Sequence, residues 1–244
     1  MKKNNKWVLI TGMASGIGSA IAVKYARSGW NIIGQYLPAC DNIKDITEKL
    51  RAVGAECVFY PCDFTDHKSL ENFVKKIKKH DIAAVVNNAG GYVSQKHFTD
   101  LSCLDIQKAF MLNATAPIMI VSALFPGMIS RHFGRIVNIS SIAAKYGGGT
   151  VSMHYGCAKR ALEGIAKTLA REGARYSVLI NNVRPGVIDT NFHKKFPKDM
   201  KSRINLIPVG RMGSAVDVAE MVYYLGSEVN NFITGQTIAV SGGE

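Results

Sequence analysis

The run Trp7-Val-Leu-Ile-Thr11, followed by Gly12-Met-Ala-Ser-Gly16-Ile-Gly18, decides how the rest of the chain is interpreted. A short apolar run predicts a buried strand, and residues 19–28 after the glycines have the spacing of a helix. Glycines between a strand and a helix let backbone N–H groups approach a phosphate at the positive end of the helix. The start of the chain therefore predicts a nucleotide-binding turn.

Short apolar runs and stretches with helical spacing alternate along the rest of the chain. Strands are expected at 30–36, 57–62, 83–87, 135–139, 178–183 and 237–240, and helices at 42–53, 68–79, 103–132, 151–176 and 215–225. A looser segment is expected at 191–209. This alternation predicts an α/β fold in which a parallel sheet of about seven strands carries helices on both faces. No linker or repeat interrupts residues 1–244, so a single domain is expected.

Candidate binding residues follow several of the expected strands. Gly12, Asp63, Asn88, Ser141 and Pro185 each come just after a strand end. The carboxyl ends of parallel strands share one edge of the sheet, and ligands of such sheets bind outside that edge. These five residues are therefore predicted to meet in one crevice.

Tyr155 and Lys159 are four residues apart in a helix expected to begin near Val151, so their side chains share one face. A tyrosine phenol has an ordinary pKa of about 10, and an adjacent ammonium lowers it. The expected result is a group that gives or takes a proton at working pH. Ser140 or Ser141 would supply a hydroxyl that orients a carbonyl oxygen. Such a pair is common by chance, and only its place at the crevice indicates proton transfer to or from an alcohol oxygen.

The composition narrows the classes of function. The formal net charge is +12, and basic residues cluster at 75–79 and 194–203. Neither cluster is interleaved with aromatic residues, so nucleic acid is not an expected partner. Five cysteines without a Cys-x-x-Cys pair and six scattered histidines give no metal-binding spacing. A reduced, cytoplasmic protein without a metal is expected, and no segment is expected to span a membrane.

Several motifs, taken in order, resemble those of the short-chain dehydrogenase/reductase family. They are Thr11-Gly-Met-Ala-Ser-Gly-Ile-Gly18, Asp63, Asn88-Ala-Gly90, Asn113, Ser141, Tyr155-Gly-Cys-Ala-Lys159, Pro185-Gly186, Gly210-Arg-Met-Gly213 and Thr234-Gly-Gln-Thr-Ile-Ala-Val-Ser-Gly-Gly243. Each motif is modest evidence, but their order along the whole chain is specific. The resemblance implies a Rossmann-type, doubly wound parallel sheet.

The same resemblance implies the residues of the site. The catalytic residues it implies are Asn113, Ser141, Tyr155 and Lys159. The cofactor-binding residues it implies are Gly12, Ser15, Gly16, Ile17, Gly18, Tyr36, Asp63, Phe64, Asn88, Ala89, Gly90, Tyr155, Lys159, Pro185, Gly186, Ile188 and Thr190. In this scheme Tyr155 is the acid/base, Ser141 steadies the substrate oxygen, Lys159 holds the nicotinamide ribose and Asn113 anchors a water. The gap between Ser141 and Tyr155 is one residue longer than the family's commonest form, and Ser140 would lengthen it further, so Ser141 is favoured.

The choice of cofactor depends on Tyr36, at the end of the second strand. NAD-dependent relatives carry an acidic residue there for the ribose 2′-hydroxyl, and Tyr36 removes that repulsion against a 2′-phosphate. The arginine that often binds this phosphate is also missing, because Ser15 and Leu37 stand where it is usually found. NADP(H) is therefore favoured over NAD(H).

The implied function is the interconversion of a ketone and a secondary alcohol, with a 3-oxoacyl thioester as the leading substrate. The nearest resemblance is to 3-oxoacyl-carrier-protein reductases, whose substrate hangs from an acidic carrier. Two alternatives stay open: an NAD-dependent alcohol or sugar dehydrogenase, and a non-catalytic regulator that senses a dinucleotide.

Charge and apolar surface carry two further expectations. Positive charge is expected at the rim of the crevice, from Lys194, Lys195, Lys198, Lys201, Arg203, Arg131, Arg135, Arg171 and Arg175. A two-fold homo-oligomer, a tetramer by the resemblance, is expected from apolar residues in excess of one buried helix face: Ala114, Pro117, Ile118, Val121, Leu124 and Phe125.

Overall fold

Seven parallel strands form one sheet in the order β3-β2-β1-β4-β5-β6-β7. The computed structural model describes residues 6–38, 43–190 and 200–244. The strands are β1 (Trp7–Ile10), β2 (Asn31–Tyr36), β3 (Cys57–Pro61), β4 (Ile82–Asn87), β5 (Gly134–Ile139), β6 (Val178–Pro185) and β7 (Thr237–Val240). The predicted Rossmann-type parallel sheet is confirmed.

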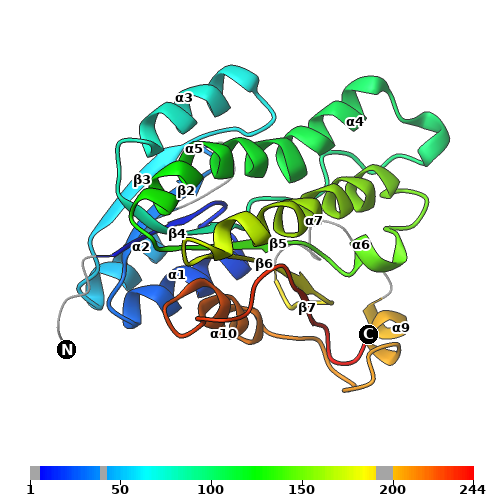
Figure 1. Cartoon of the computed structure of the whole chain (residues 1–244). Helices are drawn as coiled ribbons and strands as arrows, with labels where there is room; N and C mark the ends of the chain where they lie inside the picture. The colour runs from blue at the N-terminus through cyan, green and yellow to red at the C-terminus, as the bar shows by residue number, and fades with distance from the viewer. Residues whose placement is uncertain (1–5, 39–42, 191–199) are drawn as a thin grey trace.

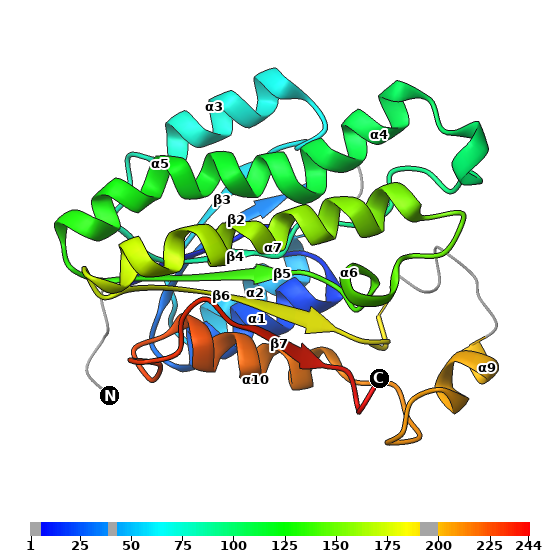
Figure 2. The same cartoon turned by 45° about the vertical axis from the view of Figure 1, so that its right-hand side comes forward.

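Helices cover both faces of this sheet, as Figures 1 and 2 show. One layer holds α1 (Gly16–Arg27), α2 (Lys44–Ala52) and α10 (Ala215–Gly226); the other holds α3 (His67–Ile77), α4 (Cys103–Phe110), α5 (Ala116–Ser130) and α7 (Met153–Ala174). Shorter helices are η1 (Phe98–Asp100), α6 (Ala143–Tyr146) and α9 (Met200–Asn205). Each layer closes its own apolar cluster against the sheet: Ile21, Trp30 and Val222 belong to one cluster, and Phe73, Ile120 and Leu162 to the other.

A row of side-chain amides crosses the buried sheet where apolar residues would be expected. Asn87, Asn138 and Asn182 are in register on neighbouring strands, and Thr237 continues the row on β7. Asn87 Nδ2 donates to Asn138 Oδ1 over 2.8 Å, Asn138 Nδ2 donates to Asn182 Oδ1 over 3.0 Å, and Asn182 Nδ2 donates to Thr237 Oγ1 over 3.0 Å. We call these four residues the amide ladder. Its hydrogen bonds link β4, β5, β6 and β7 near the carboxyl edge of the sheet.

The predicted single helix at 103–132 is wrong in its middle. A π-helical turn, η2 (Met111–Thr115), separates α4 from α5. Pro117 has no N–H to donate to the carbonyl oxygen of Asn113, four residues before it, so the regular ladder of helical bonds cannot continue there. The interruption falls on Asn113, one of the predicted catalytic residues.

The stretch Cys103–Ser130 bears on the expectation that no segment spans a membrane. Its 28 residues are long and apolar enough to do so by length and composition. The stretch nevertheless packs against the sheet, where Ala116, Ile120, Leu124 and Met128 are buried in the core. It is a core helix, in which apolar composition reflects burial by protein.

The arginines expected at the rim of the crevice lie at the opposite edge of the sheet. Arg131 and Arg135 stand at the start of β5, and Arg171 and Arg175 stand just before β6. In Figure 2 the arrowheads of β5 and β6 point away from these positions, toward α6 and α9. Arg135 is buried and donates to the carbonyl oxygens of Ser177, Ser227 and Asn230. The expectation was wrong because residues that precede a strand in the sequence lie at its amino end.

The segment 191–209, expected to be loose, contains the short helix α9 in its described part. Lys194, Lys195 and Lys198 lie outside the described residues. Arg203, on α9, forms an ion pair with Glu244 at 2.8 Å. Two of the nine expected rim charges, Lys201 and Arg203, are therefore placed by the structure at the carboxyl edge of the sheet.

Candidate active site

The glycine-rich turn leads from β1 into α1 as the sequence predicted. Gly12 has a φ of +61°, a left-handed conformation that favours glycine, and its N–H donates to Gln35 Oε1 over 2.7 Å. Ser15 caps α1, because its Oγ accepts from the N–H of Gly18 over 3.0 Å. A Cβ at Gly16 would lie only 2.7 Å from Thr190 Cγ2. The turn thus presents the positive end of a helix to the cavity that Ser15, Gly16 and Ile17 line, which suits a phosphate.

Asn88 fastens this turn to the end of β4. Its Nδ2 donates to the carbonyl oxygens of Thr11 and Gly12 over 2.9 and 3.0 Å. In the other direction Thr11 Oγ1 accepts from the N–H groups of Asn88 and Ala89 over 3.0 and 2.9 Å. Asn88 therefore holds the glycine turn in place, in addition to lining the cavity below it.

Tyr155 and Lys159 share the buried face of α7, as their spacing predicted. The helix begins at Met153, two residues later than expected. Tyr155 is 8% exposed and Lys159 3% exposed, and Lys159 Nζ lies 5.9 Å from the centre of the Tyr155 ring. Lys159 Nζ donates to the carbonyl oxygen of Ile139 over 2.8 Å. The ammonium is thereby directed at the end of β5.

Burial reverses the expected effect on the Tyr155 phenol. Desolvation raises the pKa of Tyr155 above its ordinary value, and a hydrogen bond with Ser141 only partly opposes this rise. Desolvation also lowers the pKa of Lys159 to about 7. The expected net lowering of the Tyr155 pKa is therefore not found in the chain by itself, because desolvation outweighs the opposing hydrogen bond with Ser141.

The two candidate serines have different partners. Ser140 is buried and donates to Glu163 Oε1 over 2.7 Å. Ser141 hydrogen-bonds Tyr155 and accepts from the N–H of Ala143 over 3.1 Å. Ser141 is thus the hydroxyl that lies beside the phenol.

Asn113 is fully buried in the π-helical turn and uses its side chain within the protein. Its Oδ1 accepts from the N–H of Gly91 over 2.9 Å, while its Nδ2 donates to the carbonyl oxygens of Gly91 and Ala109, each over 3.0 Å. A Cβ at Gly90 would lie 2.6 Å from Lys159 Nζ and 2.8 Å from Asn113 Oδ1. Gly90 is therefore the position that lets Asn113 and Lys159 approach each other. The water relay through Asn113 stays a prediction.

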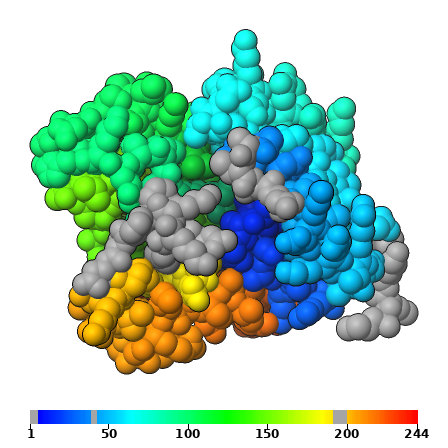
Figure 3. Space-filling view, turned by 180° about the vertical axis from the view of Figure 1, so that it is seen from behind, coloured from blue at the N-terminus to red at the C-terminus, as the bar shows by residue number. Residues whose placement is uncertain are grey.

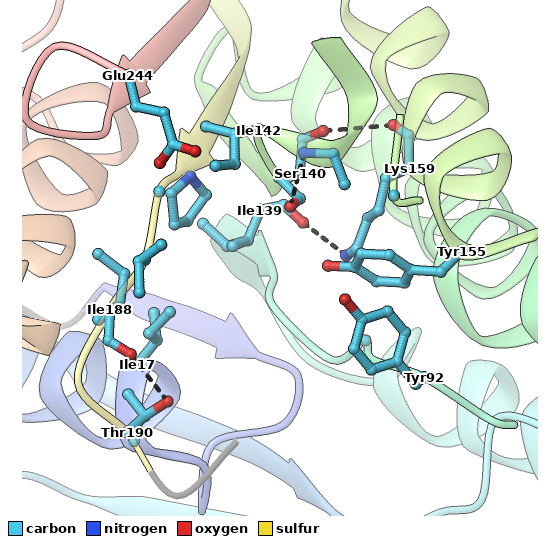
Figure 4. A pocket seen from close by; sticks show the side chains of 18 of the residues that line it. Ile17, Tyr92, Ile139, Ser140, Ile142, Tyr155, Lys159, Ile188, Thr190 and Glu244 are labelled. Atoms are coloured by element: carbon cyan, nitrogen blue, oxygen red, sulfur yellow. Dashed lines mark hydrogen bonds between the residues drawn. The ribbon is translucent and has the colours of Figure 1, made fainter. Parts of the chain in front are cut away.

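One cavity of about 790 Å³ joins most of the predicted residues. Figure 3 shows the hollowed face, where the start of the chain meets later segments, and Figure 4 shows side chains inside. Predicted residues that line it are Ser15, Gly16, Ile17, Asn88, Gly90, Ser141, Tyr155, Lys159, Pro185, Gly186, Ile188 and Thr190. The glycine turn and the Tyr155 phenol therefore face one space.

The remaining predicted residues do not line this cavity. Gly12, Gly18, Ala89 and Asn113 support it from behind. Phe64 is 2% exposed and packs edge-on against Phe73, with ring centres 5.4 Å apart, so an adenine could meet only its backbone. Asp63 is exposed, and its Oδ1 accepts from the backbone and hydroxyl of Thr65, each over 2.8 Å. Tyr36 ends β2 beside them and is partly buried.

Several residues of the site were missed in the sequence, among them Gln35, Glu163, Tyr92 and Glu244. Gln35 is buried and links the ends of three strands, through Gly12 N–H and the carbonyl oxygen of Cys62. The Glu163 carboxylate accepts a hydrogen bond from the Ser140 hydroxyl. It also accepts from two nitrogens of the Arg184 guanidinium, each at 2.6 Å. Tyr92 and Glu244 line the cavity. Gln35 carried a usable signal, since it is polar at a position whose neighbours in the pattern are apolar.

The residues present fit a dinucleotide. The α1 end and its glycine turn suit a pyrophosphate, and Lys159 faces the same cavity. The cavity also reaches Pro185, the last residue of β6, and Thr190 beyond it. A phenol, a hydroxyl and a lysine lie at the far side of this space. The arrangement can place a carbonyl group against a proton donor beside a bound nicotinamide.

Comparison with known proteins agrees with this geometry. A family model described as enoyl-(acyl carrier protein) reductase matches residues 12–244. The chain is 33% identical over 246 residues to the 3-oxoacyl-[acyl-carrier-protein] reductase of Buchnera aphidicola subsp. Schizaphis graminum, covering 100% of this chain and 98% of the relative. It is 34% identical over 251 residues to the protein of that name from Aquifex aeolicus, with the same coverage. A blue fluorescent protein from a metagenomic library, solved with NADPH, is similar with a TM-score of 0.90 and 27% identity, covering 100% of this chain and 99% of that one.

The fold and the site define an NAD(P)-binding oxidoreductase. The chain belongs to the short-chain dehydrogenase/reductase family, and the family match spans almost all of it.

Proposed function

We propose that this enzyme reduces a ketone to a secondary alcohol with NADPH, using Tyr155 as the proton donor. The observation that carries the proposal is that Tyr155, Ser141 and Lys159 face the same cavity as the α1 glycine turn. A sensor of dinucleotides would need the turn but would have no use for a buried phenol hydrogen-bonded to a serine. This argues against the non-catalytic alternative.

The residues of the chain manage the proton and the position of the substrate. Ser141 and Tyr155 both reach the substrate oxygen, so the carbonyl is held between two hydroxyl donors. The chemistry that a bound nicotinamide supplies is hydride transfer to the carbonyl carbon. As the oxygen gains charge, the phenol proton of Tyr155 passes to it and completes the alcohol. Burial raises the pKa of Tyr155, so the phenol carries at neutral pH the proton that reduction of a ketone requires.

The proposed cofactor is NADP(H). No carboxylate stands at Tyr36, so nothing at this position repels a 2′-phosphate. Solved structures of the same fold carry NADP or NADPH. The NAD-dependent alternative would need an acceptor for the ribose 2′-hydroxyl, and Tyr36 is a poor substitute for a carboxylate.

The proposed substrate is a 3-oxoacyl thioester borne by an acyl carrier. Support comes from the names of the full-length relatives, which are reductases of 3-oxoacyl groups on the acyl carrier protein. The net charge of +12 suits an acidic carrier. We further propose a cytoplasmic enzyme that acts as a two-fold homo-oligomer, a tetramer.

Replacing Tyr155 by phenylalanine tests the proposed function. Tyr155→Phe keeps the ring and removes the proton, so kcat for NADPH-dependent ketone reduction should fall by at least about 10²-fold. The Kd for NADPH, measured by nucleotide fluorescence, should change little. Tyr224→Phe, which removes an exposed phenol on α10, is the matched control. Near-normal turnover by Tyr155→Phe would show that another group donates the proton.

A further inference from the structure

Three polar residues recur at intervals of four along the buried face of α7. They are Tyr155, Lys159 and Glu163, and each is buried. Side chains four residues apart on a helix are neighbours on one face, so the three form a row. The proposed function gives roles to Tyr155 and Lys159 but none to Glu163. A buried carboxylate in line with two catalytic groups is costly to keep, because a charge away from water loses its hydration.

The row on α7 meets three consecutive residues of the chain where β5 ends. Lys159 Nζ donates to the carbonyl oxygen of Ile139 over 2.8 Å, Glu163 Oε1 accepts from the Ser140 hydroxyl over 2.7 Å, and Tyr155 hydrogen-bonds Ser141. The Ser140 hydroxyl also lies 3.3 Å from the carbonyl oxygen of Lys159, a contact that Figure 4 shows as a dashed line. Glu163 thus holds the residue between the one that anchors the lysine and the one that lies beside the phenol.

Ser140 is held by α7 and by β6 at once. Its N–H donates to the carbonyl oxygen of Val183 over 2.7 Å, and its hydroxyl donates to Glu163. The Glu163 carboxylate is itself held by two nitrogens of Arg184, the residue after Val183 on β6. The backbone that leads into Ser141 therefore starts from a residue with little freedom to move. Supporting contacts of this kind keep a reacting group in a productive geometry.

We propose that Ser140 and Glu163 are positioning residues, which hold the Ser141 hydroxyl where it can donate to the substrate oxygen. The inference rests on the proposed function, in which Ser141 and Tyr155 both reach that oxygen. Ser140 and Glu163 need not touch the substrate in this role, because they act through Ser141. A displacement of about 1 Å in a catalytic group can cost about 10²-fold in rate, so the loss of this support should appear in kcat.

The test is a double-mutant cycle on the two serines. Ser140→Ala removes the support and leaves Ser141 in the chain. In the wild-type background it should lower kcat for reduction of an acetoacetyl thioester of N-acetylcysteamine by NADPH about tenfold. In the Ser141→Ala background the same change should lower kcat by less than about twofold, because the hydroxyl that Ser140 positions is already absent. A residue that only stabilised the fold would lower kcat equally in both backgrounds.

Ser227→Ala is the matched control. Ser227 is a buried serine whose carbonyl oxygen accepts from Arg135, at the opposite edge of the sheet, so the loss of its hydroxyl should leave kcat within about twofold of the wild type. Thermal unfolding shows whether each variant is folded at the assay temperature. If Ser140→Ala is not, Ser140→Cys keeps a weak donor of similar shape and takes its place in the cycle. It should show a smaller loss with the same dependence on Ser141.

The outcomes separate the inference from the proposed function. Equal losses in the two backgrounds would show that Ser140 acts on something other than Ser141 and would overturn the inference. An unchanged kcat for Ser140→Ala in the wild-type background would overturn it as well. Both results would leave the proposed function standing. A Ser141→Ala protein with the kcat of the wild type would remove the donor role of Ser141, and the inference with it. A wild-type enzyme that reduces no ketone with NADPH would overturn the proposed function and the inference together.

Discussion

The pKa of the Lys159 side chain depends on its burial as well as on its position in the sequence. The spacing of Lys159 from Tyr155 was readable from the sequence, but the net direction of the Tyr155 pKa shift, which burial decides, was not. Burial lowers the pKa of Lys159 to about 7 and raises that of Tyr155, so each group is held toward its neutral form. Spacing fixes which residues share a helix face; the dielectric around them depends on the packing of β4, β5 and α7, which no local pattern reveals.

Tyr36 carries the prediction at the residue scale. Tyr36→Asp would place a carboxylate where the 2′-phosphate of NADPH is expected, so repulsion should weaken NADPH binding by about tenfold or more. NADH, with a free 2′-hydroxyl, should bind better, because the carboxylate can accept from it. Titration of both nucleotides into both proteins measures the two changes. Tyr36→Asn is the uncharged control. A wild-type protein that prefers NADH would contradict the proposed cofactor and leave the fold untouched.

At the scale of the element, the sequence identified every strand but not the break in its longest predicted helix. Apolar runs bounded by glycine and charge marked the strands because strands of a parallel sheet are buried on both faces. The π-helical turn at Met111–Thr115 was missed, although Pro117, four residues after Asn113, was a usable signal. Glu163 was missed for a different reason. Its partners, Ser140 and Arg184, are distant in the sequence, and only the pairing of β5 with β6 brings them together.

The Glu163–Arg184 pair gives the prediction for α7. The Glu163 side chain is 8% exposed and receives Arg184 through two nitrogens. Glu163→Ala leaves that guanidinium without its partner, so the free energy of unfolding should fall by on the order of 3 kcal/mol. Denaturation in urea measures this change. Glu172→Ala, at an exposed position of the same helix, should cost under about 0.5 kcal/mol. Equal midpoints for the two variants would mean that the buried pair adds no stability.

At the scale of the whole molecule, the parallel sheet sorts residues between two edges. The crevice lies at the carboxyl edge, and the arginines expected beside it lie at the other. The six apolar residues expected at an interface differ in their burial. Ala114, Pro117, Val121 and Leu124 belong to the chain's own core, and Phe125 packs against it. Ile118, at 47% exposure, is the member of that set that faces outward.

Ile118 therefore carries the prediction about assembly. Leu104, Ile106 and Met153 are also 40% or more exposed, on α4 and at the start of α7. A two-fold contact across these helices would bury the four side chains. Ile118→Glu should shift sedimentation toward smaller species at micromolar concentration, because the contact would have to bury a charge. Val53→Glu, at an exposed apolar position after α2, should not. A wild-type chain that sediments as a monomer would contradict the proposed oligomer.

The amide ladder has a consequence for how this sequence can change over generations. Asn138 accepts from Asn87 and donates to Asn182, so an apolar residue there would strand a buried group on each neighbouring strand. Changing two of the rungs together removes both a donor and its acceptor, and costs less than the two separate losses suggest. A protein in which one rung is replaced should thus be less stable than a protein in which two neighbouring rungs are replaced together. We therefore expect sequences that depart from this ladder to replace neighbouring rungs together rather than one at a time.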